Sequence, residues 1–557
     1  MVPPLSRRLV FAAALCAASL APRPALAQAP ADSFAATARS VIAAGHHPWA
    51  RWPEFPALAA DLRAAYEPGA YQPLWIANGG PTQAARDAVA QLAGAGDHGL
   101  DPADYDAADL AARFAALGSG PPASAADLAL LDTELTLGLT RYLVHHRMGR
   151  LDPHQFGFEF DQSVKRFDVA AGIRRASAGE NLASLVRALE PRFAQYRLLE
   201  AALPRYRALA ADSTLGPINA GPPVRPGDPL PAAPALRHLL AALGDLPAAD
   251  GADTTPMYDE PLVNAVRRFQ SRHALETDGI LGRLTLAELN VPLAQRVRQF
   301  DLALERLRWL PDLSPPIVAV NVPGFELFAF DSVGASGRPA LEMKVIVGKA
   351  LDTHTPIFIE SMRYIEFRPY WTVPLSIVRK TILPEVRKDP SYLARQGFDV
   401  LGARNRVLRS EATPAVLAGL QRGTLELRQR PGPGNPLGLA KFIFPNNHQI
   451  YLHGTPQPQL FQRSRRDFSA GCIRVEDPTV LAAWALRDQP EWTLARIDEA
   501  MEAEATSRAF LRTPVTVVIF YTTVVVRPGG AIYFYDDIYK HDAEMEQALE
   551  SGAPFRS

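Results

Sequence analysis

The spacing of hydrophobic residues changes part-way along this chain of 557 residues. Between about residues 31 and 212, apolar residues recur every three or four positions, as Leu135 and Leu139 do, which predicts amphipathic helices. From residue 317 onward they alternate with polar residues or form short runs, which predicts β-strands. We therefore expect a multidomain α+β protein, with a helical scaffold domain at residues 31–212 and a mostly β domain at residues 317–542.

Turn-forming residues bound the apolar runs of the β domain. We expect its strands at residues 317–322, 325–330, 341–347, 363–367, 441–444, 449–453, 515–526 and 532–535. The last two strands are expected to be joined by the hairpin turn Arg527-Pro528-Gly529-Gly530. Outside the strands, the pattern predicts a connecting helix within residues 293–316, a helix near residues 480–486 and a C-terminal tail at residues 543–557.

Two segments lie between the helical domain and the connecting helix. Residues 213–234 are dense in proline and glycine, which predicts an irregular linker. Residues 235–292 contain three short helix-like faces, which predicts a compact three-helix module. Thr285, followed three positions later by Glu288, has the pattern of a capping box and is expected to open the third helix.

An insertion interrupts the β domain at residues 376–425. It contains basic, helix-like runs such as Ile377-Val378-Arg379-Lys380 and Glu385-Val386-Arg387-Lys388. Long, partly helical insertions beside an active site are often lids, and a solvated surface excursion is the alternative.

The first residues have the pattern of an export signal. Arg7 and Arg8 precede an apolar run too short to span a membrane, and the small residues Ala25 and Ala27 follow it. We expect a signal peptide at residues 1–27, cleaved near Ala27 by either the general or the twin-arginine export route. No later apolar stretch is long enough for a bilayer, so a soluble extracytoplasmic protein is expected. Without the signal's three arginines, the 58 basic residues become 55 against 59 acidic ones, and this net charge of −4 argues against general nucleic-acid binding.

Signal cleavage would remove Cys16 and leave a single cysteine, Cys472. A lone thiol cannot form an internal disulfide, so its reactivity is a reason for its presence. His453 ends a β-like apolar run 19 positions earlier, and a histidine beside a thiol favours the nucleophilic thiolate. Gly471 and Arg474 give Cys472 polar, turn-forming surroundings, which favours this interpretation over a small buried hydrophobe.

The run Ser469-Ala470-Gly471-Cys472-Ile473-Arg474 resembles the active-site motif of the L,D-transpeptidases with the YkuD-type β fold. Ala470 departs from the many members that carry histidine at this position, although the large members often carry a small residue. Other runs are similar to the large, scaffold-bearing YcbB-type members, at residues 367–371, 376–379, 430–438, 441–446 and 451–456. The three-helix module resembles the peptidoglycan-binding modules of cell-wall enzymes, at residues 265–270, 278–282, 285 and 289–290.

The resemblance implies a thioester mechanism in the periplasm. Cys472 would be the nucleophile and His453 its proton partner, either in a resting thiolate–imidazolium pair or as a general base. The Gly454 carbonyl would orient the imidazole, and backbone N–H groups around Gly471 and Cys472 would hold the oxyanion. The third residue of a peptidoglycan tetrapeptide stem would be transferred to the thiol with release of D-alanine, then cross-linked to the third residue of a second stem. The resemblance implies no cofactor and no metal, and it implies acylation by carbapenem-type β-lactams.

Four further side chains are candidates for substrate binding, each with a structural alternative. Arg474 would bind a stem carboxylate or brace the cysteine turn. Tyr451 and Trp371 would line the cleft or pack in the core. Ser469 would hydrogen-bond the turn or the substrate.

Other functions and sites remain open on the sequence alone. The same acyl-enzyme could pass to water or to a free D-amino acid, as in a carboxypeptidase or exchange enzyme. A non-catalytic wall-binding scaffold is a third possibility, against which the intact pair of Cys472 and His453 argues. The expected partners are peptidoglycan stem peptides and glycan, with no nucleic acid and no membrane span, and other cell-wall enzymes stay open.

A pair of histidines in the helical domain is a weaker candidate for chemistry. His145 and His146 are adjacent, so they point to different sides of a helix, and we expect surface or capping roles for them. We expect no nucleophile and no cluster of metal ligands within residues 31–212.

Overall fold

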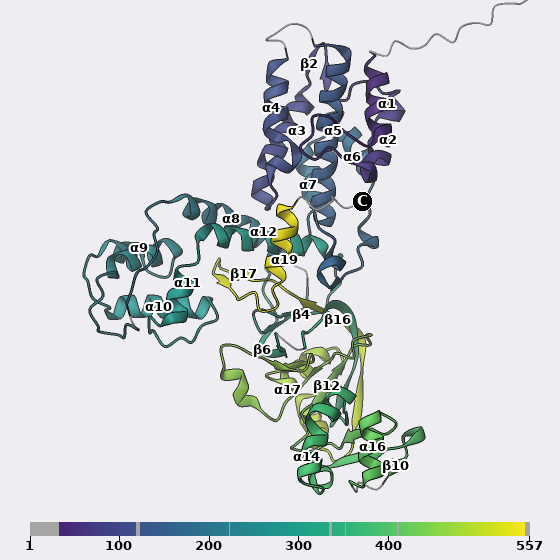
Figure 1. The fold of residues 1–557 in the computed structure, drawn as a ribbon, viewed down its shortest axis with the longest axis vertical. Helices are drawn as coiled ribbons and strands as arrows, with labels where there is room; N and C mark the ends of the chain where they lie inside the picture. Colours follow the sequence, from purple (N-terminus) through teal and green to yellow (C-terminus); the bar gives the residue numbers. More distant parts are fainter. Residues whose placement is uncertain are drawn as a thin grey trace, which may run out of the picture.

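The computed structural model of the protein describes residues 33–117, 123–221, 223–332, 337–350, 353–408 and 412–551. A helical bundle forms one end of the molecule, a small helical module projects to one side, and a β domain with a further subdomain forms the other end (Figure 1). This arrangement confirms the predicted multidomain α+β class. The predicted signal peptide lies outside the described residues. Among the helices of the described ranges, none combines the length and apolar character that crossing a membrane requires.

The bundle is organised around one long central helix. Helix α5, Ala125–Met148, is buried along most of its length by the helices around it. A short hairpin also belongs to this part, formed by β1 (Ile76–Ala77) and β2 (Gly80–Pro81). The surrounding helices are α1 (Phe34–Ala44), α2 (Ala59–Tyr66), α3 (Gln83–Ala93), α4 (Ala107–Ala116), α6 (Val169–Ser177) and α7 (Leu182–Leu189).

The burial of α5 corrects the expectation for its two histidines. His145 and His146 do point to different sides, but both sides are covered, and the residues are 1% and 0% exposed. His145 Nδ1 lies 2.8 Å from the Tyr105 hydroxyl in the bundle interior. A surface role is therefore wrong for both side chains, because other parts of the protein pack over the sides of α5 that carry them.

Two helices join the bundle to the β domain. Helix α12, Leu293–Trp309, is the predicted connecting helix, and α8, Ala194–Ala211, packs along it. The sequence placed α8 in the scaffold domain, but its apolar side shares the core of the β domain, through Tyr196, Leu199, Leu203 and Tyr206. Strand β3, Phe158–Glu159, also leaves the scaffold region and pairs in parallel with the β domain. The scaffold region thus contributes both a helix to the core of the β domain and a strand to its sheet.

The side module has three helices, as predicted. They are α9 (Ala233–Leu243), α10 (Glu260–Arg272) and α11 (Arg283–Leu289). The predicted capping box is wrong, because Gly282 precedes α11 and Thr285 lies inside it. The buried Thr285 hydroxyl instead accepts a hydrogen bond from Gln270 Nε2 at 3.2 Å. The segment predicted as a linker is irregular but not free, since its apolar residues are buried in the module: Ile218, Val224 and Leu230.

The β domain closes into a barrel. Its strands follow the order β12-β13-β15-β6-β5-β4-β16-β7, and β7 also pairs with β12. Strand β14 pairs in parallel with the C-terminal end of β6, at Val347 and Gly348. The bounds are β4 (Ile317–Asn321), β5 (Glu326–Phe330), β6 (Leu341–Gly348), β7 (Ile357–Phe367), β12 (Ala440–Ile443), β13 (Leu452–His453), β14 (Asp467–Ser469), β15 (Ile473–Val475) and β16 (Ser507–Phe520). The predicted strand at 515–526 is therefore two elements, β16 and a separate β17.

The C-terminal part of the chain covers the barrel. Strands β17 (Val524–Val526) and β18 (Ile532–Phe534) form the predicted hairpin. Helix α17, Pro478–Ala485, lies where a helix was expected, and α18, Leu494–Glu502, was not predicted. The expected tail is wrong up to residue 550, because α19, His541–Glu550, packs against α12 with Met545 fully buried.

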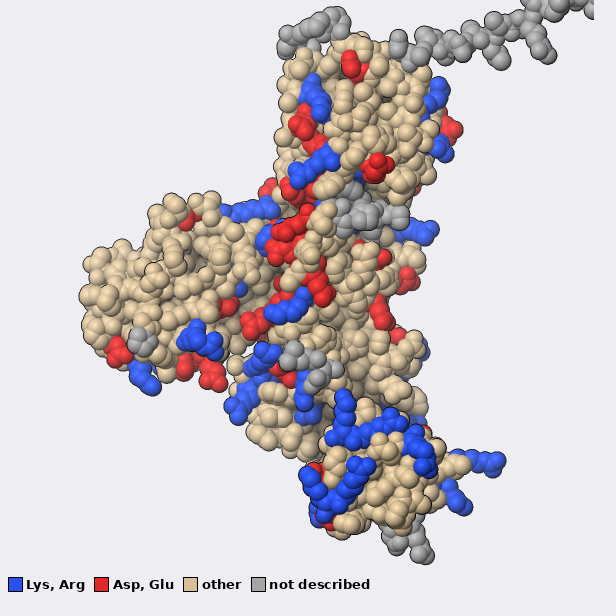
Figure 2. All heavy atoms as spheres, in the orientation of Figure 1, with Lys and Arg blue, Asp and Glu red and all other residues tan. Residues whose placement is uncertain are grey.

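The insertion forms a subdomain with its own core and sheet. The sheet order is β10-β9-β11-β8, so the unit is wider than predicted and includes the flanking strands β8 (Trp371–Thr372) and β11 (Glu426–Gln429). Lysine and arginine side chains gather on its surface, at the bottom of the view in Figure 2. Its other elements are α13 (Leu375–Ile377), a π-helical turn (Val378–Ile382), α14 (Leu383–Lys388), α15 (Tyr392–Arg395), β9 (Phe398–Leu401), β10 (Val407–Leu408) and α16 (Pro414–Arg422).

One buried carboxylate ties the scaffold to α12. Glu305 Oε1 accepts the backbone N–H groups of Arg150 and Leu151, just beyond α5, at 2.5 and 2.8 Å. It also accepts the indole N–H of Trp309 at 3.2 Å. These donors are buried, so they depend on Glu305 for an acceptor.

We expect Glu305→Ala to lower the free energy of unfolding by about 2–4 kcal/mol, because it leaves buried N–H groups unsatisfied. Thermal melting of the purified protein should show an earlier transition. Glu305→Gln keeps an oxygen acceptor and should show a smaller shift. Identical melting of Glu305→Ala and the wild type would contradict the assigned role.

Candidate functional site

The register of three strands brings the candidate residues onto the outer face of the barrel. His453 on β13 stands opposite Lys441 on β12 and opposite Arg474 on β15. Side chains alternate along a strand, so these three share one face. The adjacent residue on each of the three strands points into the barrel and is fully buried: Phe442, Leu452 and Ile473.

Cys472 joins this face from the position immediately before β15. It lies two residues before Arg474, so the same alternation sends its side chain outward. Its neighbour on the β13 side is Tyr451, whose carbonyl accepts the Ile473 N–H at 3.2 Å. The sequence-based expectation that the chain returns Cys472 to the side of His453 therefore has a structural basis, since the parallel pairing of β13 and β15 makes them diagonal neighbours.

Hydrogen bonds fix the turn that carries Cys472. The Ser469 hydroxyl donates to the Cys472 carbonyl at 2.6 Å and accepts the Gly471 N–H at 3.1 Å. Gly471 has a φ of 116°, which favours glycine, and its carbonyl accepts the Thr355 hydroxyl at 2.8 Å. Of the two predicted roles of Ser469, the structure therefore shows the bond to the turn. The Gly471 N–H is occupied, so its predicted role as an oxyanion donor requires that bond to open.

The imidazole of His453 is oriented by a backbone carbonyl. Nδ1 lies 2.6 Å from the Gly454 oxygen, which assigns the proton to Nδ1 and leaves Nε2 for proton transfer. Burial lowers the pKa of His453 to about 3, and the positive charge of Arg474 acts in the same direction. The imidazole is therefore neutral at neutral pH. Gly454 occupies the position that the resemblance gave it.

The thiol is also neutral at rest. Burial raises the pKa of Cys472, while hydrogen bonds from the Tyr451 backbone and hydroxyl and the charges of Lys441 and Arg474 oppose the rise. Lys441 Nζ lies 3.8 Å from the centre of the Tyr451 ring, and the Tyr451 and His453 rings meet edge to face at 5.7 Å. A neutral thiol beside a neutral imidazole favours general-base activation over a resting thiolate–imidazolium pair.

Lys441 was missed as a site residue, although its strand was predicted. It also faces Glu366 on β7, which pairs with Arg508 on β16 at 2.9 Å. A lysine on the polar face of a short apolar strand was the available signal, but only the register shows that this face carries Cys472.

The other candidates occupy different places. The outer face of the barrel shared by Lys441, His453, Cys472 and Arg474 is called the reactive face below. Arg474 lies on this face, where its Nη1 donates to Gln457 Oε1 at 3.3 Å. Trp371 belongs to the insertion, where its ring packs 6.4 Å from that of Phe398. Of the two roles considered for Trp371, the structure shows core packing.

A ten-residue strap, residues 430–439, runs from the insertion to β12 past His453. Asn435, buried in the strap, donates to the Pro369 carbonyl at 3.0 Å and accepts the Leu437 N–H at 2.9 Å. A Cβ on Gly438 would lie 2.6 Å from the Gly454 carbonyl carbon, so only glycine lets the strap pass so close. The strap thus supports the carbonyl that orients the imidazole.

Comparison with models of known protein families gives three matches. A Scaffold domain matches residues 60–203, a "Putative peptidoglycan binding domain" matches residues 231–289, and an L,D-transpeptidase catalytic domain of the YkuD family matches residues 315–517. The chain carries a YkuD L,D-transpeptidase catalytic domain. The reactive face of the barrel lies within this YkuD domain.

A curated relative agrees with the assignment of the YkuD domain. The chain is similar to a "Putative L,D-transpeptidase" of Haemophilus influenzae, with 30% identity over 247 residues. The similarity covers 44% of this chain and 48% of the relative, so the chain spans about half the length of the curated relative it matches.

The charges around Cys472 predict a distinct pH dependence of thiol alkylation. Because the pKa of His453 is lowered to about 3, the imidazole stays neutral above pH 5, and the rate should show no step near pH 6.5. Because the pKa of Cys472 is raised, the rate should keep rising above pH 9 as thiolate forms. Lys441→Met should slow alkylation by iodoacetamide at pH 8 by about 3- to 10-fold, since one lost favourable charge raises the thiol pKa by up to about one unit.

Lys441→Arg is the matched control, because it keeps the positive charge and should retain most of the rate. A step near pH 6 in the alkylation rate of the wild-type protein would show that the His453 imidazole becomes charged in that range. This result would contradict a resting pair in which thiol and imidazole are both neutral. Equal alkylation rates for Lys441→Met and Lys441→Arg would show that the charge of Lys441 does not affect the Cys472 thiol.

Proposed function

We propose that the protein is a peptidoglycan L,D-transpeptidase that links the third residues of two stem peptides through a thioester on Cys472. The observation that carries this proposal is the placement of Cys472 and His453 on one outer face of the YkuD barrel. The matched peptidoglycan-binding module supports a wall substrate. The predicted signal peptide supports export to the periplasm, where this substrate lies.

The first half-reaction forms the acyl-enzyme. His453 Nε2 takes the thiol proton as Cys472 Sγ bonds to the carbonyl carbon of the third stem residue. The tetrahedral intermediate collapses, the bond to the terminal D-alanine nitrogen breaks, and the imidazolium gives its proton to that leaving amine. Arg474 and Lys441 stabilise negative charge on sulfur as it develops, since both already lower the thiol pKa.

The second half-reaction forms the cross-link. An amine of a second stem attacks the thioester carbonyl and gives its proton to His453. The carbon–sulfur bond then breaks, and the thiolate takes back that proton. Water in place of the amine would give a carboxypeptidase, and a free D-amino acid would give exchange, so exclusion of water decides the product.

The insertion is proposed as the element that restricts water and holds the substrate. Its strand β11 leads directly into the strap beside Gly454. Its surface is rich in lysine and arginine (Figure 2), which suits stem peptides that carry carboxylates. Arg474 is proposed to bind such a carboxylate on the reactive face, with Tyr451 as a wall of the cleft.

We expect a carbapenem to add one adduct mass to the peptide that contains Cys472. Cys472→Ala should abolish both the adduct and the cross-linking of tetrapeptide muropeptides, measured by mass spectrometry. His453→Ala should slow acylation by about 10²–10⁴-fold, the usual loss for an acid–base group. Ala470→Ser is the matched control and should change little. A folded Cys472→Ala protein that still forms cross-links would exclude the mechanism.

We expect removal of the insertion to raise hydrolysis relative to cross-linking. Thr372 on β8 is the antiparallel partner of Arg428 on β11, so residues 373–427 can be replaced by an Asn-Gly turn that closes a hairpin. Loss of the insertion admits water to the thioester, which shifts muropeptide products from dimers to tripeptides. Carbapenem adduct formation controls for an intact site. An unchanged product ratio in a variant that forms the adduct would exclude the lid role.

A further inference from the structure

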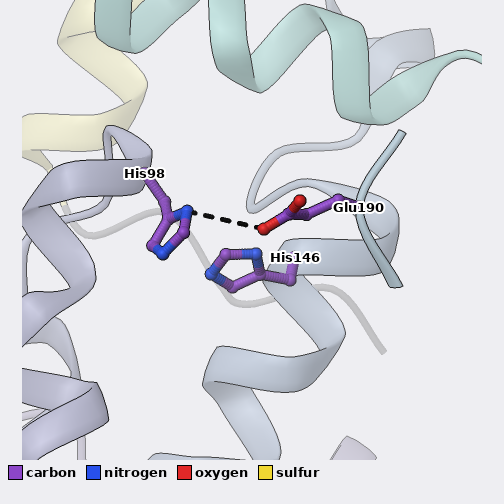
Figure 3. Close-up of side chains that lie close together, drawn as sticks. All are labelled: His98, His146 and Glu190. Carbon is purple, nitrogen blue, oxygen red and sulfur yellow. Dashed lines mark ion pairs between the residues drawn. The ribbon is translucent and has the colours of Figure 1, made fainter. Parts of the chain in front are cut away.

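Three side chains from distant parts of the scaffold meet where the bundle joins α8. His98 ends the 3₁₀-helix Gly94–His98, His146 lies in the last turn of α5, and Glu190 follows α7. They point toward one another (Figure 3), and the atoms they offer as ligands, one per residue, all lie within 4.8 Å of one another. This group of potential metal ligands was not identified from the sequence.

A second carboxylate lies beside this group. His98 Nδ1 is 3.8 Å from Glu190 Oε1 and 2.6 Å from Glu200 Oε1 on α8. Glu200 thus adds a second carboxylate beside the three-residue group, through its contact with His98.

His146 has an unusual environment for a buried histidine. Its side chain is 0% exposed, and in the described part of the chain neither ring nitrogen has a hydrogen-bond partner. The rings of Tyr142 and His98 pack edge-on against it at 4.4 and 4.6 Å. Buried polar groups are usually satisfied, and an unsatisfied one costs about 1–3 kcal/mol. A ligand on the ring nitrogen that faces the carboxylate would remove part of this cost.

The donor set matches the preferences of zinc and similar divalent ions. Imidazole nitrogen and carboxylate oxygen bind Zn²⁺ at about 2.0–2.2 Å, which puts tetrahedral ligand atoms about 3.4 Å apart. The ligand atoms observed here lie up to 4.8 Å apart, so they would need to close by up to about 1.4 Å, which rotamer adjustment of Glu190 and the two histidines would supply. Glu200 would serve as the fourth ligand or as the carboxylate that orients His98.

The neighbouring charges allow a cation at this point. The buried Arg308 donates to the His98 carbonyl and to the Tyr196 hydroxyl, and its charge opposes a metal ion. Two carboxylates, Glu190 and Glu200, face the group, and Arg308 also has Glu305 as a partner at 3.6 Å, so the surrounding charges do not exclude a cation.

We propose that His98, His146 and Glu190, with Glu200 beside them, form a structural site for a divalent metal ion of the zinc class. The ion would join the end of α5 and the segment after α7 to α8, which belongs to the core of the β domain. It would thereby stiffen the joint between the scaffold and the YkuD domain. The site is independent of Cys472 and takes no part in acyl transfer.

The test uses the full mature chain in a Cys472→Ala background, so that the thiol cannot bind metal. After chelation and dialysis, the protein is titrated with Zn²⁺ by calorimetry and with Co²⁺ by visible absorption. We expect one equivalent to bind, tetrahedral cobalt bands to appear and the melting temperature to rise. Glu190→Gln, which is close to isosteric, and His98→Gln should each weaken Zn²⁺ binding by at least about 10- to 100-fold.

His154→Gln is the control, because His154 is an exposed histidine of the same domain and lies outside the cluster. The metal-free protein with its native Cys472 should still form the carbapenem adduct, which separates this site from the proposed function. Absence of stoichiometric Zn²⁺ binding in the parent protein would overturn the proposal and leave the group as a buried polar cluster. Equal affinity in Glu190→Gln, His98→Gln and the control would also overturn it.

Discussion

The reactive face of the barrel depends on the pairing register of β13. Leu452 pairs with Phe442 on one side and with Ile473 on the other, and all three side chains are fully buried. A slip of one residue would turn Leu452 outward, at a cost of about 1.5–3 kcal/mol, and would turn the His453 imidazole into the apolar barrel interior. The hydrophobic side of the strand therefore fixes the register, and the positions of His453, Lys441 and Arg474 follow from it.

This register also produces the electrostatics of the site. An imidazole that is buried between Lys441 and Arg474 is held neutral, as its pKa of about 3 shows. The same two cations lower the pKa of Cys472 against the effect of burial. The arrangement therefore disfavours charge on the base at rest and favours negative charge on sulfur during the reaction. Such preorganised charge acts without reorganisation at the moment of reaction.

Local patterns predicted most strands of the barrel and the pair of Cys472 and His453, because alternation and the cysteine turn are encoded in neighbouring residues, but the short strands β14 and β15 and helix α18 were not predicted. Contacts between distant segments were not predictable in this way. Closure of the barrel through β7 and β12, the packing of α8 on the β domain and the charge of Lys441 beside Cys472 all depend on tertiary register. The capping box failed for a related reason, since the Thr285 hydroxyl is used by Gln270 of a neighbouring helix. His145 and His146 were misplaced because helical periodicity does not show that the two sides of α5 that carry them are both covered.

The two connections between the insertion and the barrel are tied to each other, and this couples the insertion to the imidazole. On one side the chain leaves β7 at Arg368, which has a φ of 53° and whose N–H donates to the Leu439 carbonyl at 2.8 Å. On the other side the strap returns past Gly454, and Asn435 holds it to Pro369. These two hydrogen bonds join the outgoing and the returning connections at the base of the insertion. The Gly454 carbonyl that orients His453 lies against that strap, so the insertion is connected through the strap to the residue that holds the base in place.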